Sequence, residues 1–182
     1  MSSSQYFPAI ARRRAAAGVT LIELLVVIAI AAVLLGLGVP AFTYVTRTLR
    51  LQGTVAQLQT DLATARGEAI KRNQRVLICA ANSTGLDCST STNWGTAGWI
   101  VCYDANSDGA CDTAPTNGSN PNPIVARGAP SNAITVAATT AMLRFNANGS
   151  SSAGGGFTLT VTAGDGTHRS VSVASSGQIT KQ

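Results

Sequence analysis

Charged side chains are scarce in this chain of 182 residues. Asp, Glu, Lys and Arg together make up only 12% of it, and histidine occurs once, at His168. Disorder driven by charge repulsion needs far more charge, so the chain is expected to fold. Most hydrolytic and metal-based active sites draw on histidine and acidic clusters. His168 stands in a Gly/Thr-rich turn without a partner for acid–base work, so a cytosolic enzyme is disfavoured.

The few basic residues are unevenly placed. The formal net charge is +5, but three of the thirteen basic residues are the consecutive Arg12, Arg13 and Arg14. Six more lie in residues 47–75 against two acidic ones, whereas residues 76–182 hold four against five. Any surface for nucleic acid is therefore expected mainly along residues 47–75.

A long apolar run follows the arginine triplet. Residues 24–39 carry no polar side chain, and with their apolar neighbours the run reaches about two dozen residues. As a helix it would be about 36 Å long, enough to cross the hydrocarbon core of a membrane. The positive-inside rule then places the N-terminus in the cytoplasm and the residues beyond Phe42 outside.

Two residues of this run stand out. Glu23 places a carboxylate at the start of an apolar helix, and this position favours a functional charge that pairs with a partner. The alternatives are a glutamate at headgroup level in a plain signal anchor and a cleaved secretory signal, although the run is long for the latter. Pro40 lacks a backbone N–H, so a kink or local melting is expected between Gly36 and Pro40, unless the proline simply ends the span.

The string Gly18-Val19-Thr20-Leu21-Ile22-Glu23, with the basic leader before it, resembles the class III prepilin signal of type IV filament subunits. The resemblance implies that a prepilin peptidase cuts between Gly18 and Val19 and that the new amine of Val19 is methylated. Val19 departs from the phenylalanine usual at this position. The positive amine and Glu23 of a neighbouring subunit would then pair, so that both charges are stabilised only in a filament.

The residues after Phe42 predict a second helical segment. Apolar residues spaced by three or four lie on one helical face that ends at about Arg72. They are Val55, Leu58, Leu62, Ala65 and Ala69. The charged residues among them are expected to face solvent. These are Arg66, Glu68, Lys71 and Arg72.

Beyond Asn73 the apolar period changes to two, which predicts strands. The expected strands are residues 75–80, 99–103, 134–138, 142–145, 157–162 and 169–174. The predicted fold is α+β, with a long N-terminal helix, transmembrane and then amphipathic, packed on an antiparallel β-sheet body. Its expected parts are a cleaved leader (1–18), a transmembrane helix (19–42), an amphipathic continuation (43–74) and a β-rich periplasmic body (75–182).

A second block of sequence is similar to the GspH/FimT family of minor pilins and pseudopilins. It comprises residues 58–73, residues 76–79, Trp94, residues 98–101 and residues 104–109. The resemblance implies a non-enzymatic structural subunit near the tip of a type II secretion pseudopilus or a type IV pilus. It also implies a single-pass protein of the bacterial inner membrane, with other pilin or pseudopilin subunits and the prepilin peptidase as partners.

Four cysteines, Cys79, Cys88, Cys102 and Cys111, lie in the part predicted to be exported, where disulfides form. No CxxC spacing and no second ligand type accompanies them, so a zinc site is not expected. Of the three pairings, Cys79 with Cys88 and Cys102 with Cys111 is favoured, since each closes a short loop at a strand end. Each bond is expected to add about 2–3 kcal/mol.

Oxygen-bearing side chains alternate before a glycine in the segment that follows, as they do in calcium loops. They are Asp104, Asn106 and Asp108, with Asp112 next. The motif requires a bidentate glutamate at its twelfth position, where this chain has Pro115. A turn held by Asx hydrogen bonds and a disulfide is therefore favoured over calcium, and no other cofactor is expected.

The C-terminus bears on an alternative function. Some members of the family bind DNA through a C-terminal Gly-Arg-x-Arg motif, and the corresponding stretch here is Gly177-Gln178-Ile179-Thr180-Lys181. One lysine replaces two arginines, which removes both bidentate phosphate contacts. A DNA-binding minor pilin, with Arg169 and Lys181 as contacts, is thus the alternative to a purely structural subunit.

Overall fold

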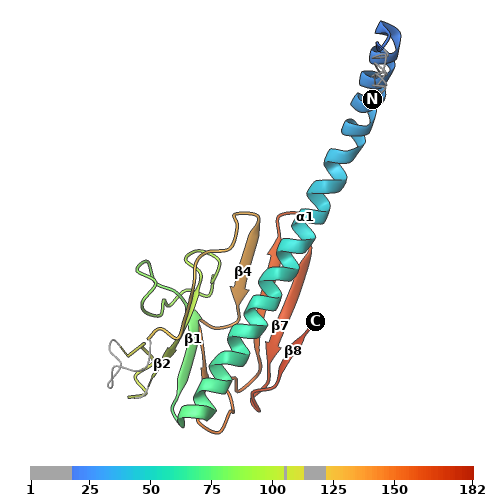
Figure 1. Cartoon of the computed structure of the whole chain (residues 1–182). Helices are drawn as coiled ribbons and strands as arrows, with labels where there is room; N and C mark the ends of the chain where they lie inside the picture. Colours follow the sequence, from blue (N-terminus) through green and yellow to red (C-terminus); the bar gives the residue numbers. More distant parts are fainter. Residues whose placement is uncertain (1–17, 105, 113–121) are drawn as a thin grey trace, which may run out of the picture. The chain divides into compact units, whose positions relative to one another are not determined.

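The computed structural model describes residues 18–104, 106–112 and 122–182, and the backbone but not the side chains of residues 37–41. The predicted leader, apart from Gly18, and Pro115 lie outside the described residues. One helix precedes eight strands in the described part (Figure 1). They are α1 (Leu21–Arg72), β1 (Val76–Ala80), β2 (Trp99–Tyr103), β3 (Val125–Arg127), β4 (Ile134–Ala138), β5 (Met142–Phe145), β6 (Phe157–Ala163), β7 (His168–Val173) and β8 (Ile179–Lys181). The predicted end of the helix and six strands are confirmed, whereas β3 and β8 were not predicted.

The chain divides into two compact units, Met1–Phe42 and Thr43–Gln182. The first unit holds the N-terminal part of α1, and the second holds its remainder and all strands of the described residues. A kink or local melting is expected between Gly36 and Pro40; the helix is continuous through Pro40, so local melting is wrong and the kink stays a prediction. A proline inside a helix removes one backbone hydrogen bond, and the surrounding turns here keep their helical form.

No helix among the described residues combines the length and the apolar character needed to cross a membrane.

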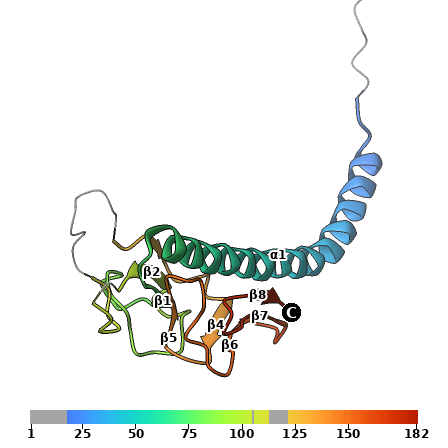
Figure 2. The ribbon, with the colours of Figure 1, turned by 90° about the horizontal axis from the view of Figure 1, so that it is seen from below.

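The strands of the second unit form two four-stranded sheets. Their strand orders are β3-β2-β1-β5 and β4-β6-β7-β8, and every pairing is antiparallel. Residues 43–72 of α1 lie across strands of both sheets (Figure 2). The body is therefore a helix packed on antiparallel sheet, as the change of apolar period predicts.

The main core lies between α1 and the two sheets. The predicted helical face is buried, with every one of its five residues at 0% exposure, and Leu51 extends it toward the N-terminus. In β6 buried residues alternate with half-buried ones, which is typical of a sheet covered on one face. In β1 and β2 every residue is buried. A second apolar cluster covers their other face, and it contains the cysteines.

Candidate assembly site

The first turn of α1 is closed by Thr20. Its hydroxyl oxygen accepts the backbone N–H of Glu23 at 3.3 Å, and its carbonyl oxygen accepts the N–H of Leu24 at 3.2 Å. Threonine followed three positions later by glutamate is the sequence signature of a capping box, and this signal could have predicted the start of the helix. The helix dipole also stabilises a carboxylate in this turn by about 0.3–1 kcal/mol. The cap itself is thus made by the Thr20 hydroxyl and the backbone N–H of Glu23, and the Glu23 carboxylate lies in the turn where a negative charge is favoured.

The charge of Glu23 has no basic partner in the part of the chain that the structure describes. The four ion pairs found there use the carboxylates of Asp61, Glu68 and Asp104. Gly18 and Val19 precede the helix and are exposed, so the bond between them lies outside regular structure. The first described residues thus present an exposed carboxylate at Glu23 and an exposed, non-helical peptide bond between Gly18 and Val19.

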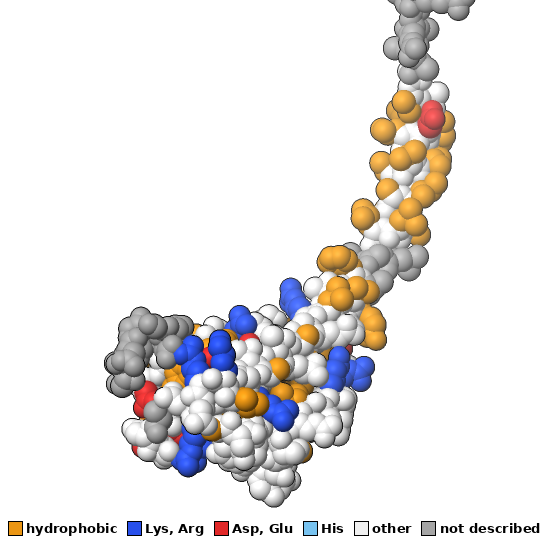
Figure 3. Space-filling view, turned by 60° about the horizontal axis from the view of Figure 1, so that its bottom comes forward, with side chains coloured by type: hydrophobic (Ala, Val, Ile, Leu, Met, Phe, Trp, Pro, Cys, Tyr) orange, Lys and Arg blue, Asp and Glu red, His pale blue; other side chains and the backbone are white. Residues whose placement is uncertain are grey.

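The first unit exposes a nearly continuous apolar surface. From Leu21 to Leu35, every large apolar side chain is at least 48% exposed. Figure 3 shows these side chains along the described part of this helix. A helix that is apolar on all sides is stable when lipid or other helices cover it. This surface is therefore one that a second molecule or a lipid phase must cover.

An ion pair with a buried carboxylate attaches α1 to the body. Asp61 is 1% exposed, and its two oxygens accept hydrogen bonds from Arg127 on β3 at 3.0 Å each. The indole N–H of Trp99 on β2 donates to the same carboxylate at 2.9 Å. The hydrogen bonds that Arg127 donates to Asp61 raise the pKa of Arg127 above its ordinary value. Three donors thus satisfy a carboxylate that would be costly to bury alone.

A second polar contact joins the last turns of α1 to β2. Glu68 Oε2 accepts hydrogen bonds from Arg72 Nε at 2.7 Å and from the Tyr103 hydroxyl at 3.0 Å. The Arg72 guanidinium also lies 5.1 Å from the centre of the Tyr103 ring. The bond from Arg72 lowers the pKa of Glu68, and burial, together with Glu68, raises the pKa of Tyr103 to about 12. The helix end is fixed on the sheet by charge as well as by apolar packing.

The expectation that the charged residues near the end of α1 face solvent is wrong for three of the four. Arg66, Glu68 and Arg72 are half-buried, and only Lys71 is exposed. Arg66 donates from Nε to the Gly149 carbonyl at 3.0 Å and from Nη2 to the Ser176 carbonyl at 3.3 Å, so it ties two loops to the helix. These basic groups are used inside the body, which reduces the charge available to nucleic acid.

The residues proposed for DNA contact come together on one sheet face. Lys181 pairs in register with Val171, and Arg169 lies two positions before Val171 on the same strand. The two side chains therefore occupy diagonal positions on neighbouring strands. Both are exposed, as is His168. His168 lies 3.4 Å from the Gly166 carbonyl through Nδ1, a contact within its own turn.

The oxygens of the predicted calcium loop accept hydrogen bonds from the loop itself. Asp108 accepts from Ala110 N–H at 2.8 Å and from Asn106 Nδ2 at 2.8 Å, and the backbone bond from Ala110 lowers the pKa of Asp108. Asp104 is fully buried and lies 3.3 Å from Arg144 Nε, which supplies a positive charge. The predicted fourth oxygen ligand, on Asp112, follows Cys111 directly. This arrangement favours a turn stabilised by Asx hydrogen bonds.

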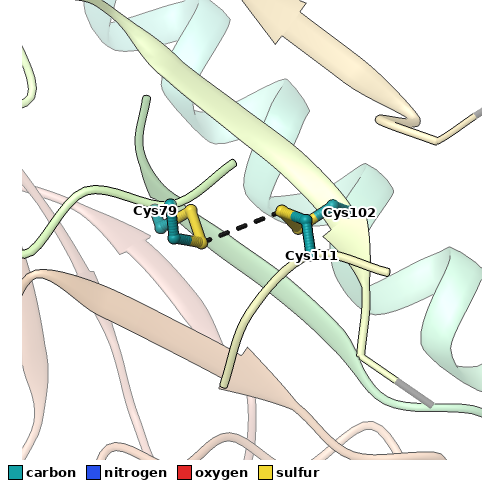
Figure 4. A group of neighbouring side chains, drawn as sticks. Cys79, Cys102 and Cys111 are labelled. Atoms are coloured by element: carbon teal, nitrogen blue, oxygen red, sulfur yellow. Dashed lines mark hydrogen bonds between the residues drawn. A yellow bond between two sulfur atoms is a disulfide. The ribbon is translucent and has the colours of Figure 1, made fainter. Parts of the chain in front are cut away.

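The disulfides join Cys79 to Cys88 and Cys102 to Cys111, which confirms the favoured pairing. Figure 4 shows the two bonds side by side against β1 and β2. They belong to the second apolar cluster, on the face of this sheet away from α1. Each bond closes a loop that leaves the end of a strand, so the cysteines fasten the two loops to the sheet.

Two family models match the chain. One, described as type II transport protein GspH, matches residues 54–177. The other, described as a prokaryotic N-terminal methylation motif, matches residues 13–39. Among curated proteins, none matches the chain.

Solved structures of two other proteins are similar to the chain. The type IV minor pilin FimU of Pseudomonas aeruginosa, in two crystal forms, is 21% identical, with TM-scores of 0.53 and 0.51. The matches cover 75% and 72% of this chain and 91% and 92% of FimU. The minor pseudopilin EpsH from the type 2 secretion system of Vibrio cholerae is 11% identical over 73% of this chain and 96% of EpsH, with a TM-score of 0.48. The FimU matches confirm the predicted helix-on-sheet fold.

Proposed function

The chain belongs to the GspH family of type II transport proteins and is a minor pilin or pseudopilin, and from this premise we propose that it acts by assembling with other pilin subunits through its N-terminal helix. The observation that carries this proposal is the exposed apolar surface of residues 21–36. Lipid covers such a surface before assembly, and neighbouring helices cover it afterwards. The proposed role is structural and involves no catalysis.

Processing of the N-terminus is the first step of the proposal. A prepilin peptidase cuts between Gly18 and Val19, and the amine of Val19 is then methylated. The match of residues 13–39 to a methylation motif supports this step. The exposed, non-helical position of the bond also supports it, because a peptidase needs an accessible chain.

The new amine and Glu23 then set the register between subunits. Glu23 has no basic partner among the described residues, so its charge is free to pair with the amine of a neighbouring helix. Two opposite charges held in a low dielectric stabilise each other strongly only when they are close, so a wrong axial offset is penalised.

The proposed location is the bacterial inner membrane, with residues 19–42 spanning once and the body in the periplasm. Arg12, Arg13 and Arg14 would hold the leader on the cytoplasmic side. The two disulfides suit an oxidising compartment such as the periplasm. The machine is either a type II secretion pseudopilus or a type IV pilus. A deletion strain separates the two, since it loses protein secretion in the first case and pilus function in the second.

Substitutions at Glu23 test the register role against the capping role. Glu23→Ala removes the whole carboxylate side chain, whereas Glu23→Gln removes the charge and keeps a side chain of the same length that suits a capping box. Both variants are expected to insert and to be processed but to assemble poorly, as measured by cross-linking to neighbouring subunits in sheared filaments. Thr20→Ala is the matched control, because it weakens the cap and keeps the charge. If Glu23→Gln assembles normally, the register role is refuted.

Mass spectrometry of the native protein tests the processing step. The expected mass is that of a chain beginning at methylated Val19. A chain that retains its first eighteen residues, or one that has lost the apolar helix, would contradict the proposal.

DNA binding is the second candidate, and the diagonal placement of Arg169 and Lys181 on neighbouring strands supports it. Phosphate contacts of this kind give salt-sensitive, sequence-independent binding. Retention of duplex DNA at low salt is expected to weaken in the Arg169→Gln/Lys181→Gln variant. Absence of retention at low salt would exclude this function.

A further inference from the structure

A cleft of about 430 Å³ lies beside α1 in the second unit. One face of the helix contributes residues spaced by three or four to its lining. They are Arg50, Gly53, Thr54 and Gln57. The rest of the lining includes Arg127, at the end of β3, and the segment that follows it as far as Ser131. Two guanidinium groups from distant parts of the sequence therefore line one cleft.

The guanidinium group of Arg127 is held in place and is only partly used. Its Nε and Nη2 donate to the two oxygens of Asp61, which takes up two of its five N–H groups. The other three donate to no described residue, and the side chain is 38% exposed. Because the buried carboxylate fixes the plane of the guanidinium, little conformational entropy is lost when the remaining N–H groups bind an acceptor.

Arg50 brings a second positive charge to the cleft. This residue is exposed and takes part in none of the four ion pairs among the described residues. Asp61 offsets the charge of one of the two arginines, so one positive charge is left in excess. An anion with a single negative charge and two oxygens matches this excess and the fork of the guanidinium. A carboxylate and a phosphodiester both have these properties.

Gly53 leaves room for such a group next to the helix. A Cβ on Gly53 would meet no described atom of the chain within 4 Å, so the space in front of it is open. A glycine inside a helix costs about 1 kcal/mol relative to alanine. What the glycine permits is the close approach of another group to the backbone.

The position of the cleft favours a carboxylate of a protein over the phosphate of a lipid. Gly53 lies ten residues after Thr43, the first residue of the second unit, which is about 15 Å along the helix. The headgroup layer on each side of a bilayer is only about 5–8 Å thick. With residues 19–42 as the span, the lining of the cleft therefore lies beyond the lipid phosphates, where the proposed assembly places other subunits.

We propose that this cleft binds the carboxylate of an aspartate or glutamate on a neighbouring pilin subunit. The carboxylate accepts hydrogen bonds from Arg50 and from the remaining N–H groups of Arg127. The amide of Gln57 and the hydroxyl of Ser131 are further donors in the lining. This inference rests on the proposed assembly function and adds a contact made by the body to those made by the N-terminal helix.

Binding of a model carboxylate to the full chain in detergent tests the cleft without assembly. The chain, labelled at the tryptophan indoles for NMR, is titrated with the peptide acetyl-Gly-Glu-Gly-amide. Trp99 lines the cleft and its indole N–H donates to Asp61, whereas Trp94 is not among the lining residues. A saturable shift of the Trp99 indole resonance is expected, with that of Trp94 unchanged. No saturable shift, or the same shift with the peptide that has glutamine in place of glutamate, would overturn the proposal.

Two matched pairs of variants separate charge from shape in this titration. Arg50→Gln is expected to weaken binding at least about 10-fold, as for the loss of a hydrogen bond to a charged group. Arg47→Gln removes the same charge outside the cleft and is expected to bind as the parent chain does. Gly53→Leu fills the open space and is expected to abolish binding, whereas Gly67→Leu, at another helical glycine that faces open space, is not. Equal affinities within either pair would overturn the proposal.

Photo-cross-linking in cells identifies the partner. A photoreactive phenylalanine analogue replaces Asn132, an exposed residue directly after Ser131. The expected product joins this position to another pilin subunit, within a few residues of an aspartate or glutamate, and its yield falls in Arg50→Gln. Products with lipid or DNA alone, or with a subunit segment that lacks an acidic residue, would overturn the proposal.

The same analogue at Leu34, on the exposed apolar helix, tests the proposed assembly separately. If Leu34 gives no product with any subunit, the assembly function itself is refuted. If Leu34 gives such products and Asn132 gives none, assembly stands and the carboxylate cleft alone is refuted.

Discussion

Replacing Arg127 by leucine is expected to destabilise the body far more than replacing Asp61 by asparagine, although the two residues share one ion pair. Asp61 is 1% exposed and accepts two hydrogen bonds from Arg127 at 3.0 Å. In Arg127→Leu the carboxylate stays buried, with Trp99 as its remaining donor among the described residues. Leaving a buried charge without its partner costs about 3–5 kcal/mol.

The reverse change removes the charge from the buried side. In Asp61→Asn the side-chain oxygen can still accept the Trp99 N–H, which lies 2.9 Å from Asp61 in the unchanged chain. Arg127 is 38% exposed, so its guanidinium can turn to water. The free energy of unfolding is expected to fall by about 1–2 kcal/mol, because the lost hydrogen bonds to the charged carboxylate are replaced in part by bonds of Arg127 to water. The double variant is expected to cost less than the sum of the two single changes, because it leaves no unpaired charge.

Tryptophan fluorescence during urea unfolding measures these losses. Both tryptophans of the chain, Trp94 and Trp99, are buried in the second unit, so their signal reports on the body. A loss of about 3–5 kcal/mol is a large fraction of the 5–15 kcal/mol typical of a domain. The reasoning is refuted if Asp61→Asn costs as much as Arg127→Leu, or if the two single losses add up in the double variant.

Two further changes test the body. Burial raises the pKa of Tyr103 to about 12 from an ordinary 10.0, so the folded state keeps a proton that the unfolded chain loses. The contribution of Tyr103 to the free energy of unfolding is therefore expected to be fully present below pH 10 and to fall by on the order of 2–3 kcal/mol as the pH rises toward 12. Urea titrations at several pH values measure this fall, and Tyr103→Phe is expected to remove it. Gly177 and Gly166 both have positive φ, but a Cβ at Gly177 would collide with the Gly149 carbonyl oxygen, whereas Gly166 faces open space. Gly166→Ala is expected to lower the free energy of unfolding by about 1 kcal/mol, and Gly177→Ala by clearly more. Equal urea midpoints of the two variants would contradict the collision.

Periodicity predicted most of the fold because burial follows the helix and strand periods directly. The helical stripe from Val55 to Ala69 is buried as predicted, and it ends with the helix at Arg72. The strands β3 and β8 have three residues each, too few to show a period. Short strands of this kind are recognised by their partners in the sheet, which the sequence does not show.

The buried charges could be predicted only in part. Asp61 lies three positions after Leu58 and one before Leu62, so the apolar stripe itself marks it as buried. Its partner Arg127 is 66 residues away, and no local pattern connects the two. In the same way, the loop lengths predicted which cysteines pair, whereas the contact between the two disulfides depends on the register of Leu77 with Cys102.

The helix α1 carries two kinds of side chains, exposed apolar ones near its start and charged ones that bind strands and loops further along. Residues 21–36 expose apolar side chains, so in the proposed assembly the favourable free energy comes from covering this part of the helix. Further along, Asp61, Arg66 and Glu68 hold the same helix to strands and loops through charged hydrogen bonds. Apolar packing alone lets a helix slide along its axis at little cost, but a bidentate pair is lost within an ångström or so of displacement. These charged contacts, buried at Asp61 and half-buried at Arg66 and Glu68, therefore resist axial force on the helix, and in the proposed assembly their loss is expected to weaken incorporation even where the body still folds.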